Sequence, residues 1–332
     1  MILVTGGNGL IGSAIAERLA RKGEKLRLQV RRRCAIGTLF PDLLANSSIE
    51  IVELDFALAR EADYLRLVAG CESVIHTAGL VHKPQSSPEL YEILNRQATA
   101  SLAQAARDSS VGTFVFLSSM AVYGAGPLES IAETAPLKAQ GAYALSKAAS
   151  EADLKSHPPC PRLIILRPSL VFGPGDRGNM ISLIARIDSG RYFHIGGNRA
   201  TKSLIFSLDA AAAVLACLEK VGEGCHTFNL SNRQATSVIA LSDVIAGVLQ
   251  RRTPLPSLPE ALLRAGASIA EAFLGRRSPL TCEQIDKLTT TTTCSVEALV
   301  AATGFEPASP LSEALKAEID WARSAGILTA SR

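Results

Sequence analysis

The first twelve residues of the chain, MILVTGGNGLIG, constrain its fold more than any other stretch. Met1–Val4 is a short apolar run typical of a buried strand, and from Leu10 onward the apolar residues recur at helical spacing. The turn between them fits the dinucleotide pattern G-x-G-x-x-G and the looser T-G-x-x-G-x-x-G through Gly6, Gly7, Gly9 and Gly12. Because glycine lets a backbone approach a ligand and a helix N-terminus offers unpaired N–H groups, we expect a diphosphate site here. The alternative is an ordinary glycine-rich turn.

Arginines follow the second expected strand. Leu26–Val30 is that strand, and Arg31, Arg32 and Arg33 come directly after it. A dinucleotide fold often carries an acidic residue roughly 20 residues past the glycines, where it binds the ribose hydroxyls. An acidic side chain repels a 2′-phosphate whereas arginine attracts it, so the sequence favours NADP(H) over NAD(H). A solvated basic loop is the alternative, and NAD(H) stays open.

Two further strands end in residues that suit a cofactor pocket. Ile49–Leu54 is followed by Asp55 and Phe56, which could hold an adenine by a hydrogen bond and a ring contact. They could equally be a helix cap and a core ring. Val74–Gly79 ends in small residues that let the backbone touch a cofactor. His76, inside that strand, is interpreted as a packed histidine rather than a catalyst.

A helix and an apolar strand come next. Helical spacing of apolar residues predicts a helix over Glu89–Ser109. Asn95 lies inside it and is a mediocre helix former, so its side chain is expected to serve the backbone of a neighbouring strand. Thr113–Leu117 is apolar and ends in Ser118 and Ser119. Two serines at the carboxyl end of a central parallel strand lie where open α/β sheets bind ligands.

Tyr143 and Lys147 form a Y-x-x-x-K pair, and residues four apart on a helix share one face. The ammonium is expected to favour the ionised tyrosine oxygen and so to lower the tyrosine pKa. That would give an acid/base group usable near neutral pH. Such a pair by itself is usually surface decoration, but here it follows a glycine turn and a strand that ends in serines.

Composition excludes several other classes of protein. The 332 residues are 47% hydrophobic, which is ample for a core, and the net charge of +3 does not argue for nucleic acid. The seven cysteines are scattered without a C-x-x-C pair, so we expect reduced thiols in a cytoplasm and no metal site. Met1 already begins the first strand, so no signal peptide is expected. The longest apolar run, Ala261–Leu274, contains Arg264 and Glu271 and is too short for a membrane span.

Taken in order, these pieces resemble an extended short-chain dehydrogenase/reductase of the NAD-dependent epimerase/dehydratase type. The matching segments are Thr5–Gly12, His76–Gly79, Ser118–Ser119 with Val122–Gly124, Tyr143 with Lys147, and Leu166–Asp176. A weaker likeness continues to Thr303–Pro307 near the C-terminus.

The resemblance implies roles for individual residues. Ser119 would bond the reacting oxygen of the substrate, Tyr143 would exchange its proton, and Lys147 would bind the nicotinamide ribose. Ser118 is the alternative to Ser119. The implied cofactor contacts are Gly6, Asn8, Gly9, Leu10, Ile11, Gly12, Arg31, Arg32, Asp55, Phe56, Thr77, Ala78, Gly79, Ser118, Tyr143, Lys147, Pro168 and Val171.

The resemblance also implies substrate contacts, at Val81, Ser119, Tyr143, Asn179 and Lys202. Lys202 stands where the family carries an arginine that binds the substrate diphosphate. Lysine still attracts phosphate, but it lacks the two-pronged guanidinium.

The predicted fold class is α/β, a Rossmann-type doubly wound parallel sheet with a smaller, mostly helical C-terminal domain. Residues 1–173, joined again by about 205–230, would form the NAD(P)-binding domain. Residues from about 174 to 204 and 231–332 would form the substrate domain. The five threonines from Thr289 to Thr293 are expected to be a strand or an extended edge.

Three functions remain open. The first is an NADPH-dependent reductase of a 4-keto sugar nucleotide, which the arginines after the second strand favour. The second is a UDP-glucose or UDP-N-acetylglucosamine 4-epimerase with tightly held NAD. The third is a non-catalytic dinucleotide sensor. A UDP-sugar substrate and a homodimer are expected; Arg31–Arg32, His82–Lys83 and Gly175–Asn179 resemble the bacterial branch that acts on N-acetylated deoxy-sugar nucleotides.

Overall fold

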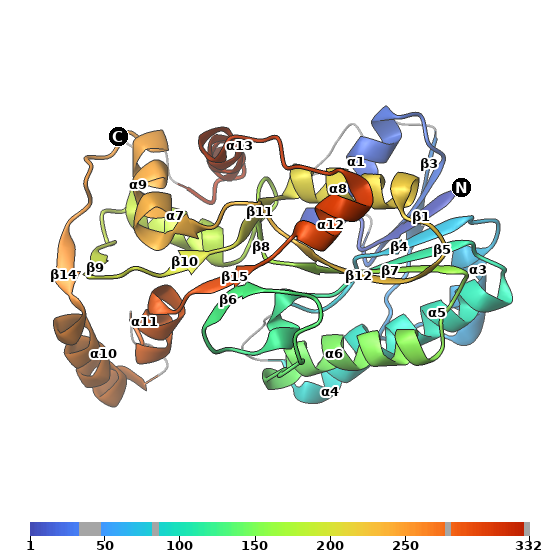
Figure 1. Cartoon of the computed structure of the whole chain (residues 1–332), viewed down its shortest axis with the longest axis horizontal. Coiled ribbons are helices and arrows are strands. Elements are labelled where there is room, and N and C mark those ends of the chain that lie inside the picture. Colours follow the sequence, from blue (N-terminus) through green and yellow to red (C-terminus); the bar gives the residue numbers. More distant parts are fainter. Residues whose placement is uncertain (33–47, 82–85, 276–279, 329–332) are drawn as a thin grey trace.

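The computed structural model describes residues 1–32, 48–81, 86–275 and 280–328. A parallel sheet runs through the molecule in the strand order β12-β7-β5-β4-β1-β2-β3 (Figure 1). Its strands are β1 (Ile2–Thr5), β2 (Leu26–Val30), β3 (Ile49–Glu53), β4 (Ser73–His76), β5 (Thr113–Leu117), β7 (Arg162–Pro168) and β12 (Gly224–Leu230). The order reverses at β1, which is the doubly wound arrangement that the sequence predicted.

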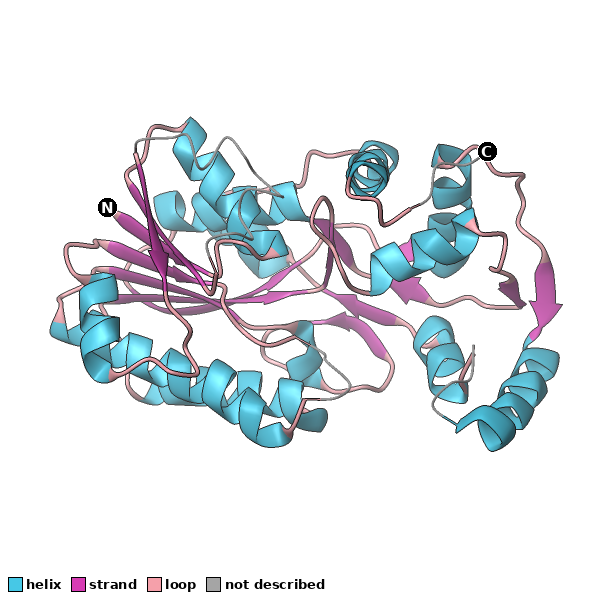
Figure 2. Cartoon of the chain, turned by 180° about the vertical axis from the view of Figure 1, so that it is seen from behind, coloured by secondary structure: helices cyan, strands magenta, loops and turns pink. Residues whose placement is uncertain are grey.

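Helices cover both faces of this sheet. One face carries α1 (Leu10–Arg21), α8 (Ser207–Lys220) and α12 (Glu297–Thr303). The other carries α3 (Glu61–Val68), α4 (Pro88–Tyr91), the π-helix η2 (Glu92–Gln97), α5 (Ala98–Asp108) and α6 (Gly141–Ser156). Figure 2 shows the same layers from behind. Because both faces are covered, the central strands are mostly apolar.

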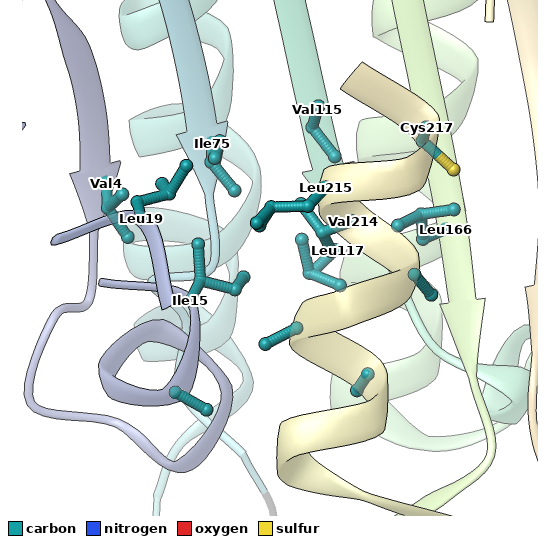
Figure 3. Close-up of a cluster of buried hydrophobic side chains, with 14 of the residues drawn as sticks. Val4, Ile15, Leu19, Ile75, Val115, Leu117, Leu166, Val214, Leu215 and Cys217 are labelled. Carbon is teal, nitrogen blue, oxygen red and sulfur yellow. The ribbon is translucent and has the colours of Figure 1, made fainter. Parts of the chain in front are cut away.

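The core between the sheet and its first helical layer is made of aliphatic side chains (Figure 3). Ile15 and Leu19 of α1 and Leu215 of α8 pack onto the strands. Their partners on the sheet are Val4, Ile75, Val115, Leu117 and Leu166. Each such side chain contributes about 1.5–3 kcal/mol on burial. This packing fixes where the carboxyl ends of β1, β4 and β5 lie.

The sequence predicted most elements of this half within a residue or two. The helix expected over Glu89–Ser109 is present, but it contains the π-turn η2 in its middle. Asn95 lies within that turn. Neither α3 nor the short strand β6 (Leu128–Ile131) was predicted.

The rest of the described chain forms small sheets and helices. The short strands are β8 (Leu170–Phe172), β9 (His194–Gly196), β10 (Thr201–Lys202), β11 (Leu204–Phe206), β13 (Thr236–Ser237), β14 (Ser257–Pro259) and β15 (Thr292–Cys294). The helices are the 3-10 turn η3 (Met120–Tyr123), α7 (Asn179–Asp188), α9 (Val238–Val248), α10 (Glu260–Leu274), α11 (Cys282–Thr289) and α13 (Leu311–Ser324).

These short strands tie distant parts of the chain together. β15 pairs with β6 and with β10, so a strand from the predicted first domain joins a sheet of the C-terminal region. The threonine run is strand only at its end, because Thr289 still belongs to α11. β12 returns to the main sheet beside β7.

Neither a membrane-spanning helix nor a metal-binding cluster is found among the described residues. No helix in residues 1–32, 48–81, 86–275 or 280–328 is both long and apolar enough to cross a membrane. Within the same ranges, no group of three or more His, Cys, Asp or Glu side chains is arranged to hold a metal ion.

Candidate active site

The loop between β1 and α1 leaves no room for side chains at two of its glycines. Gly6 has a φ of +66°, and a Cβ there would lie 2.8 Å from the Ala78 backbone. A Cβ on Gly12 would lie 2.3 Å from the carbonyl oxygen of Gly6. The loop therefore packs closely against the exit of β4, which is the approach that a dinucleotide backbone needs.

The start of α1 fits an anion. Gly9 precedes the helix, no side chain caps it, and the first turn carries no acidic residue. Gly9 is exposed and Asn8, Leu10 and Ile11 are half-buried. With N–H groups unsatisfied by side chains and a positive dipole end, this helix start fits the diphosphate of a dinucleotide.

Gln29 braces the loop and was missed by the sequence analysis. Its carbonyl oxygen accepts from the N–H of Gly6 at 2.9 Å, and its amide donates to the Leu54 carbonyl at 2.6 Å. The signal was a second polar residue, after Arg27, in the short strand β2. Gln29 therefore fixes the loop to the ends of both β2 and β3.

The residues after β2 and β3 differ in their exposure and in their protein partners. Arg31 and Arg32 are exposed, and Arg33 lies outside the described residues. Asp55 accepts from the N–H of Ala57 at 3.0 Å. Phe56 is buried and stacks on Tyr64 with ring centroids 5.4 Å apart. Phe56 thus has the core position that the sequence analysis gave as an alternative, and an adenine contact through its ring has no support here.

The exit of β4 is held by buried hydroxyls. His76 is buried; its ring nitrogens contact the hydroxyls of Thr5 at 2.7 Å and Thr99 at 2.9 Å. Burial first, and the charge of Lys147 second, lower the His76 pKa to about 3. His76 is therefore a neutral packed residue, as predicted. The Thr77 hydroxyl donates to the Thr5 carbonyl at 2.6 Å, and Ala78 and Gly79 follow on the surface of the loop.

Asn95 holds the same loop from the helix side. Its side-chain oxygen accepts from the N–H of Leu80 at 2.6 Å, and its amide donates to the Leu80 carbonyl at 3.1 Å. The amide also donates to the Ser146 hydroxyl at 2.9 Å, which links the loop to α6. This confirms that Asn95 serves a neighbouring backbone, and it explains the tolerance for a π-turn at this point.

Ser119, Tyr143 and Lys147 come together at the carboxyl end of β5. The hydroxyls of Ser119 and Tyr143 are hydrogen-bonded to each other. The Ser119 oxygen also accepts from the N–H of Ala121 at 3.1 Å. Lys147 is buried, donates to the Leu117 carbonyl at 2.8 Å and lies 4.6 Å from the centre of the Phe116 ring. The arrangement can place a proton donor and a second hydroxyl on one oxygen.

The pKa of the Tyr143 phenol differs in direction from the expectation. Burial raises it above its usual value, the bond from Ser119 lowers it in part, and the neighbouring Tyr91 raises it. Burial also lowers the Lys147 pKa to about 8, against the opposing effect of Glu151. The expectation that the ammonium lowers the tyrosine pKa was wrong for this structure, because burial sets the direction of the shift and Lys147 is not among the groups that cause it.

Three other expected cofactor residues have different surroundings. The Ser118 hydroxyl donates to the Glu151 carboxylate at 2.5 Å and is buried. Pro168 ends β7 and is buried, and Val171 is half-buried in β8. The partner of Ser118 makes Ser119, rather than Ser118, the serine that meets Tyr143.

The expected substrate residues lie on separate segments. Val81 follows the β4 exit and is 61% exposed, and Asn179 is exposed at the first position of α7. Lys202 is half-buried in β10 and donates to the Thr290 carbonyl at 2.5 Å. Burial lowers its pKa to about 8. His82 and Lys83, which carried part of the subfamily likeness, lie outside the described residues.

A family model describes most of the chain. The model "NAD dependent epimerase/dehydratase family" matches residues 2–231. A dTDP-4-dehydro-6-deoxy-D-allose reductase from a Streptomyces species is 30% identical over 274 residues, covering 75% of this chain and 81% of that protein. A UDP-glucose 4-epimerase from Vibrio cholerae is 26% identical over 273 residues, covering 77% and 78%.

The fold is similar to that of solved 4-epimerases. UDP-glucuronic acid 4-epimerase from Bacillus cereus, in complex with UDP-glucuronic acid and NAD, superposes with a TM-score of 0.77. The two chains are 19% identical, and the match covers 98% of this chain and 99% of the other. This similarity supports the fold.

Proposed function

The chain belongs to the NAD-dependent epimerase/dehydratase family of extended short-chain dehydrogenases/reductases and is an NAD(P)-dependent enzyme; on that premise we propose that it is an NADPH-dependent reductase of a 4-keto sugar nucleotide. The observation that carries the proposal is the bonded pair of Ser119 and Tyr143 hydroxyls beside buried Lys147. This centre lies at the carboxyl end of β5, two strands from the glycine loop. A UDP-sugar is the proposed substrate.

We assign the dinucleotide to the glycine loop and the neighbouring strand exits. The residues proposed to hold it are Gly6, Asn8, Gly9, Leu10, Ile11, Gly12, Thr77, Ala78, Gly79, Tyr143, Lys147, Pro168 and Val171. Exposed Arg31 and Arg32 would bind a 2′-phosphate, which supports NADP(H) over NAD(H). Asp55 stays a proposed adenine contact, because its bond to the Ala57 N–H uses only the Oδ1 oxygen; Phe56 and Ser118 are left out because the ring of one and the hydroxyl of the other are buried against protein partners.

The chemistry is shared between the cofactor and three side chains. When bound, the nicotinamide supplies the hydride. Tyr143 gives its phenolic proton to the oxygen of the substrate carbonyl, and the Ser119 hydroxyl donates a hydrogen bond to the same oxygen. Lys147 lies one turn after Tyr143 on α6, and its ammonium is fixed by the Leu117 carbonyl.

The raised pKa of Tyr143 suits this direction of reaction. A reduction needs a group that is protonated before the hydride arrives, and burial keeps the phenol protonated at neutral pH. A general acid in this position contributes roughly 10²–10⁴-fold in rate.

We propose Val81, Asn179 and Lys202 as contacts to the sugar nucleotide, with Lys202 at the diphosphate. Lys202 is half-buried, and its pKa of about 8 leaves the ammonium mostly charged at neutral pH. A phosphate beside it would favour the charged ammonium and raise that pKa. We also propose a homodimer.

The second candidate is a sugar-nucleotide 4-epimerase. The observation that favours it is the 26% identity with a UDP-glucose 4-epimerase over most of both chains. Such an enzyme would use Ser119, Tyr143 and Lys147 in both directions and would keep its nucleotide between turnovers.

One experiment separates the two candidates. The purified protein is denatured, any released nucleotide is identified, and the native protein is assayed with a UDP-4-keto sugar and NADPH. The reductase proposal predicts exchangeable nucleotide and NADPH consumption that depends on the keto sugar. Released NAD together with interconversion of UDP-sugars without added cofactor would establish the epimerase instead. Absence of both activities in a nucleotide-binding protein would contradict both candidates.

A further inference from the structure

The centre of this inference is a buried ion pair one helical turn beyond Lys147. Glu151 of α6 is 1% exposed, and Arg167 of β7 is 2% exposed. The guanidinium donates to the carboxylate through Nε at 2.9 Å and Nη2 at 2.6 Å. Ser118 adds a third donor, at 2.5 Å. A buried carboxylate needs such donors, and pairs of this kind do not by themselves imply a gain in stability.

We propose that Glu151 is a positioning residue for the Ser119–Tyr143–Lys147 centre. It holds α6 against the exits of β5 and β7, and because it binds the Ser118 hydroxyl, it leaves Ser119 as the serine that meets Tyr143. The proposal rests on the proposed function of that centre. It goes beyond the glycine loop and the Y-x-x-x-K pair, because Glu151 touches neither the substrate oxygen nor the dinucleotide in our assignment.

The first argument is the double attachment of α6 to the exit of β5. Lys147 donates to the carbonyl of Leu117, the last residue of β5, at 2.8 Å. Glu151, four residues later on the same helix face, accepts from the hydroxyl of the next residue, Ser118. Two consecutive residues of the strand exit are therefore held by side chains one turn apart, which fixes α6 along and around its axis.

The second argument is the alternation of side chains along extended backbone. Ser119 has a φ of −164° and a ψ of 150°, so it continues the extended path of the strand. Successive side chains in such a path point to opposite sides. The Ser118 hydroxyl is bound to Glu151, so Ser119 leaves the strand on its other side and meets the hydroxyl of Tyr143, which comes from the N-terminal end of the same helix, two turns before Glu151.

The third argument is the set of hydrogen bonds that Arg167 makes outside the ion pair. Arg167 Nη1 donates to the Tyr123 hydroxyl at 2.8 Å and to the Glu133 carbonyl at 3.1 Å. The Tyr123 hydroxyl donates to Asn229 at 2.7 Å. Tyr123 ends the turn η3 that begins just after Ser119. The network thus holds both sides of the catalytic serine.

The titratable groups around Lys147 make the proposal testable by pH. Glu151 on α6 raises the Lys147 pKa and opposes the lowering by burial. His76 on β4 also faces it and is neutral, and Tyr143 lies one turn before it on α6. From β5 the neighbours are the Phe116 ring and the Leu117 carbonyl, which carry no charge. Loss of the Glu151 charge is therefore expected to lower the Lys147 pKa further.

The test compares three variants with the wild-type holoenzyme. Glu151→Leu/Arg167→Met removes both buried charges at once, which avoids leaving an unpaired guanidinium. Ser118→Ala breaks only the link to the strand. Asp153→Asn, also on α6, is the control, because it removes a half-exposed ion pair with Arg96 of η2. Kd for NADPH, kcat, KM and the pH dependence of kcat are measured.

For the double variant we expect kcat to fall at least tenfold, Kd and KM to stay within about threefold, and the alkaline limb of the kcat profile to move to lower pH. Ser118→Ala is expected to lower kcat without moving the alkaline limb, and Asp153→Asn to change nothing. A double variant that binds NADPH with unchanged kcat and an unchanged alkaline limb would overturn the proposal. If the double variant does not fold, unchanged kcat in Ser118→Ala overturns it.

A failure of the proposed function can be distinguished from a failure of the positioning role of Glu151. Wild-type protein that reduces no 4-keto sugar nucleotide would remove the reductase assignment but would not test Glu151. In that case crystal structures of the wild type and Ser118→Ala decide. We expect the hydrogen bond between the Ser119 and Tyr143 hydroxyls to be lost in Ser118→Ala, and its retention at the wild-type distance would contradict the positioning role.

Discussion

The two halves of the molecule each bury a glutamate, and they neutralise it in opposite ways. In the dinucleotide half, Glu151 is matched by the Arg167 guanidinium at 2.6 Å. In the C-terminal region, Glu318 of α13 is 0% exposed beside the carboxylate of Asp176, another acid. Burial first, and the Asp176 charge second, raise the Glu318 pKa to about 9.

This difference predicts that the stability of the two halves depends differently on pH. In the dinucleotide half, the Arg167 guanidinium supplies the charge that balances Glu151. Two carboxyls side by side cannot both ionise cheaply, so Glu318 must keep its proton. Asp176 accepts from the N–H groups of Gly178 and Ile181 and so fixes the start of α7, where Asn179 lies. The proposed substrate segment is therefore tied to the proton on Glu318, whereas the dinucleotide half balances its buried glutamate with the Arg167 guanidinium.

The largest expected effect comes from the tight packing around Gly12 in the dinucleotide half, compared with the open surroundings of Gly247 in the C-terminal region. Gly12→Val should weaken NADPH binding at least a hundredfold, because its Cβ would lie 2.3 Å from a backbone oxygen of the glycine loop. Gly247→Ala, in α9 of the C-terminal region, is the matched control, since nothing lies within 4 Å of its added Cβ. The control should leave binding unchanged and add about 0.5–1 kcal/mol of stability. Isothermal titration and thermal unfolding measure both; equal effects of the two variants would break the contrast.

The second prediction tests the proton on Glu318. A folded-state pKa of about 9, raised from 4.5, gives stability that is complete below pH 4.5 and is lost as pH rises toward 9. Glu318→Gln keeps the shape and cannot ionise. The variant should match the wild type at pH 5 and be more stable at pH 9, by a few kcal/mol or about 5 °C in Tm.

The control for that measurement is Glu313→Gln, an exposed glutamate on the same helix. It should leave the pH dependence of Tm as in the wild type. A Glu318→Gln variant whose Tm falls with pH as steeply as that of the wild type would show that this carboxyl is already ionised in the fold. The two halves would then not differ in their dependence on protons.

The smallest expected effect concerns the cofactor preference of the dinucleotide half. Arg31→Asp should weaken NADPH by about tenfold, which corresponds to about 1.4 kcal/mol, because a charge-assisted contact to the 2′-phosphate becomes a repulsion. NADH binding in the same variant is the control and should change little. An equal loss of affinity for both nucleotides would refute the 2′-phosphate role. Fluorescence titration with each nucleotide gives the ratio directly.

The dinucleotide half could be predicted from the sequence because its signals are local. The glycine spacing, the apolar strands and the Tyr143–Lys147 spacing each follow from the backbone of one element. Glu151 stands four residues after Lys147 on α6, yet its partner Arg167 is on the strand β7, so no periodicity links Glu151 to Arg167. The same holds for Gln29, whose role depends on a loop and a strand that meet only after folding.

The C-terminal region could not be predicted in the same way. Its strands are two or three residues long, as in β10 and β15, which is too short to show an alternating pattern. They exist because Lys202 pairs with Thr292 across a long sequence separation. Tyr143 illustrates the same limit for electrostatics, because the sequence gives its neighbour Lys147 but not the burial that raises the Tyr143 pKa.

The most direct measurement of the central claim follows the hydride. The wild-type protein is incubated with a UDP-4-keto sugar and NADPH labelled with deuterium at the nicotinamide C4 position, and the product is examined by mass spectrometry and NMR. We predict one deuterium at C4 of the sugar for the wild type. Tyr143→Phe should bind NADPH normally and give no labelled product, whereas Tyr192→Phe, which alters a buried phenol bonded to Ser242 in the other half, should transfer the label. Label transfer at the wild-type rate in Tyr143→Phe would contradict the account.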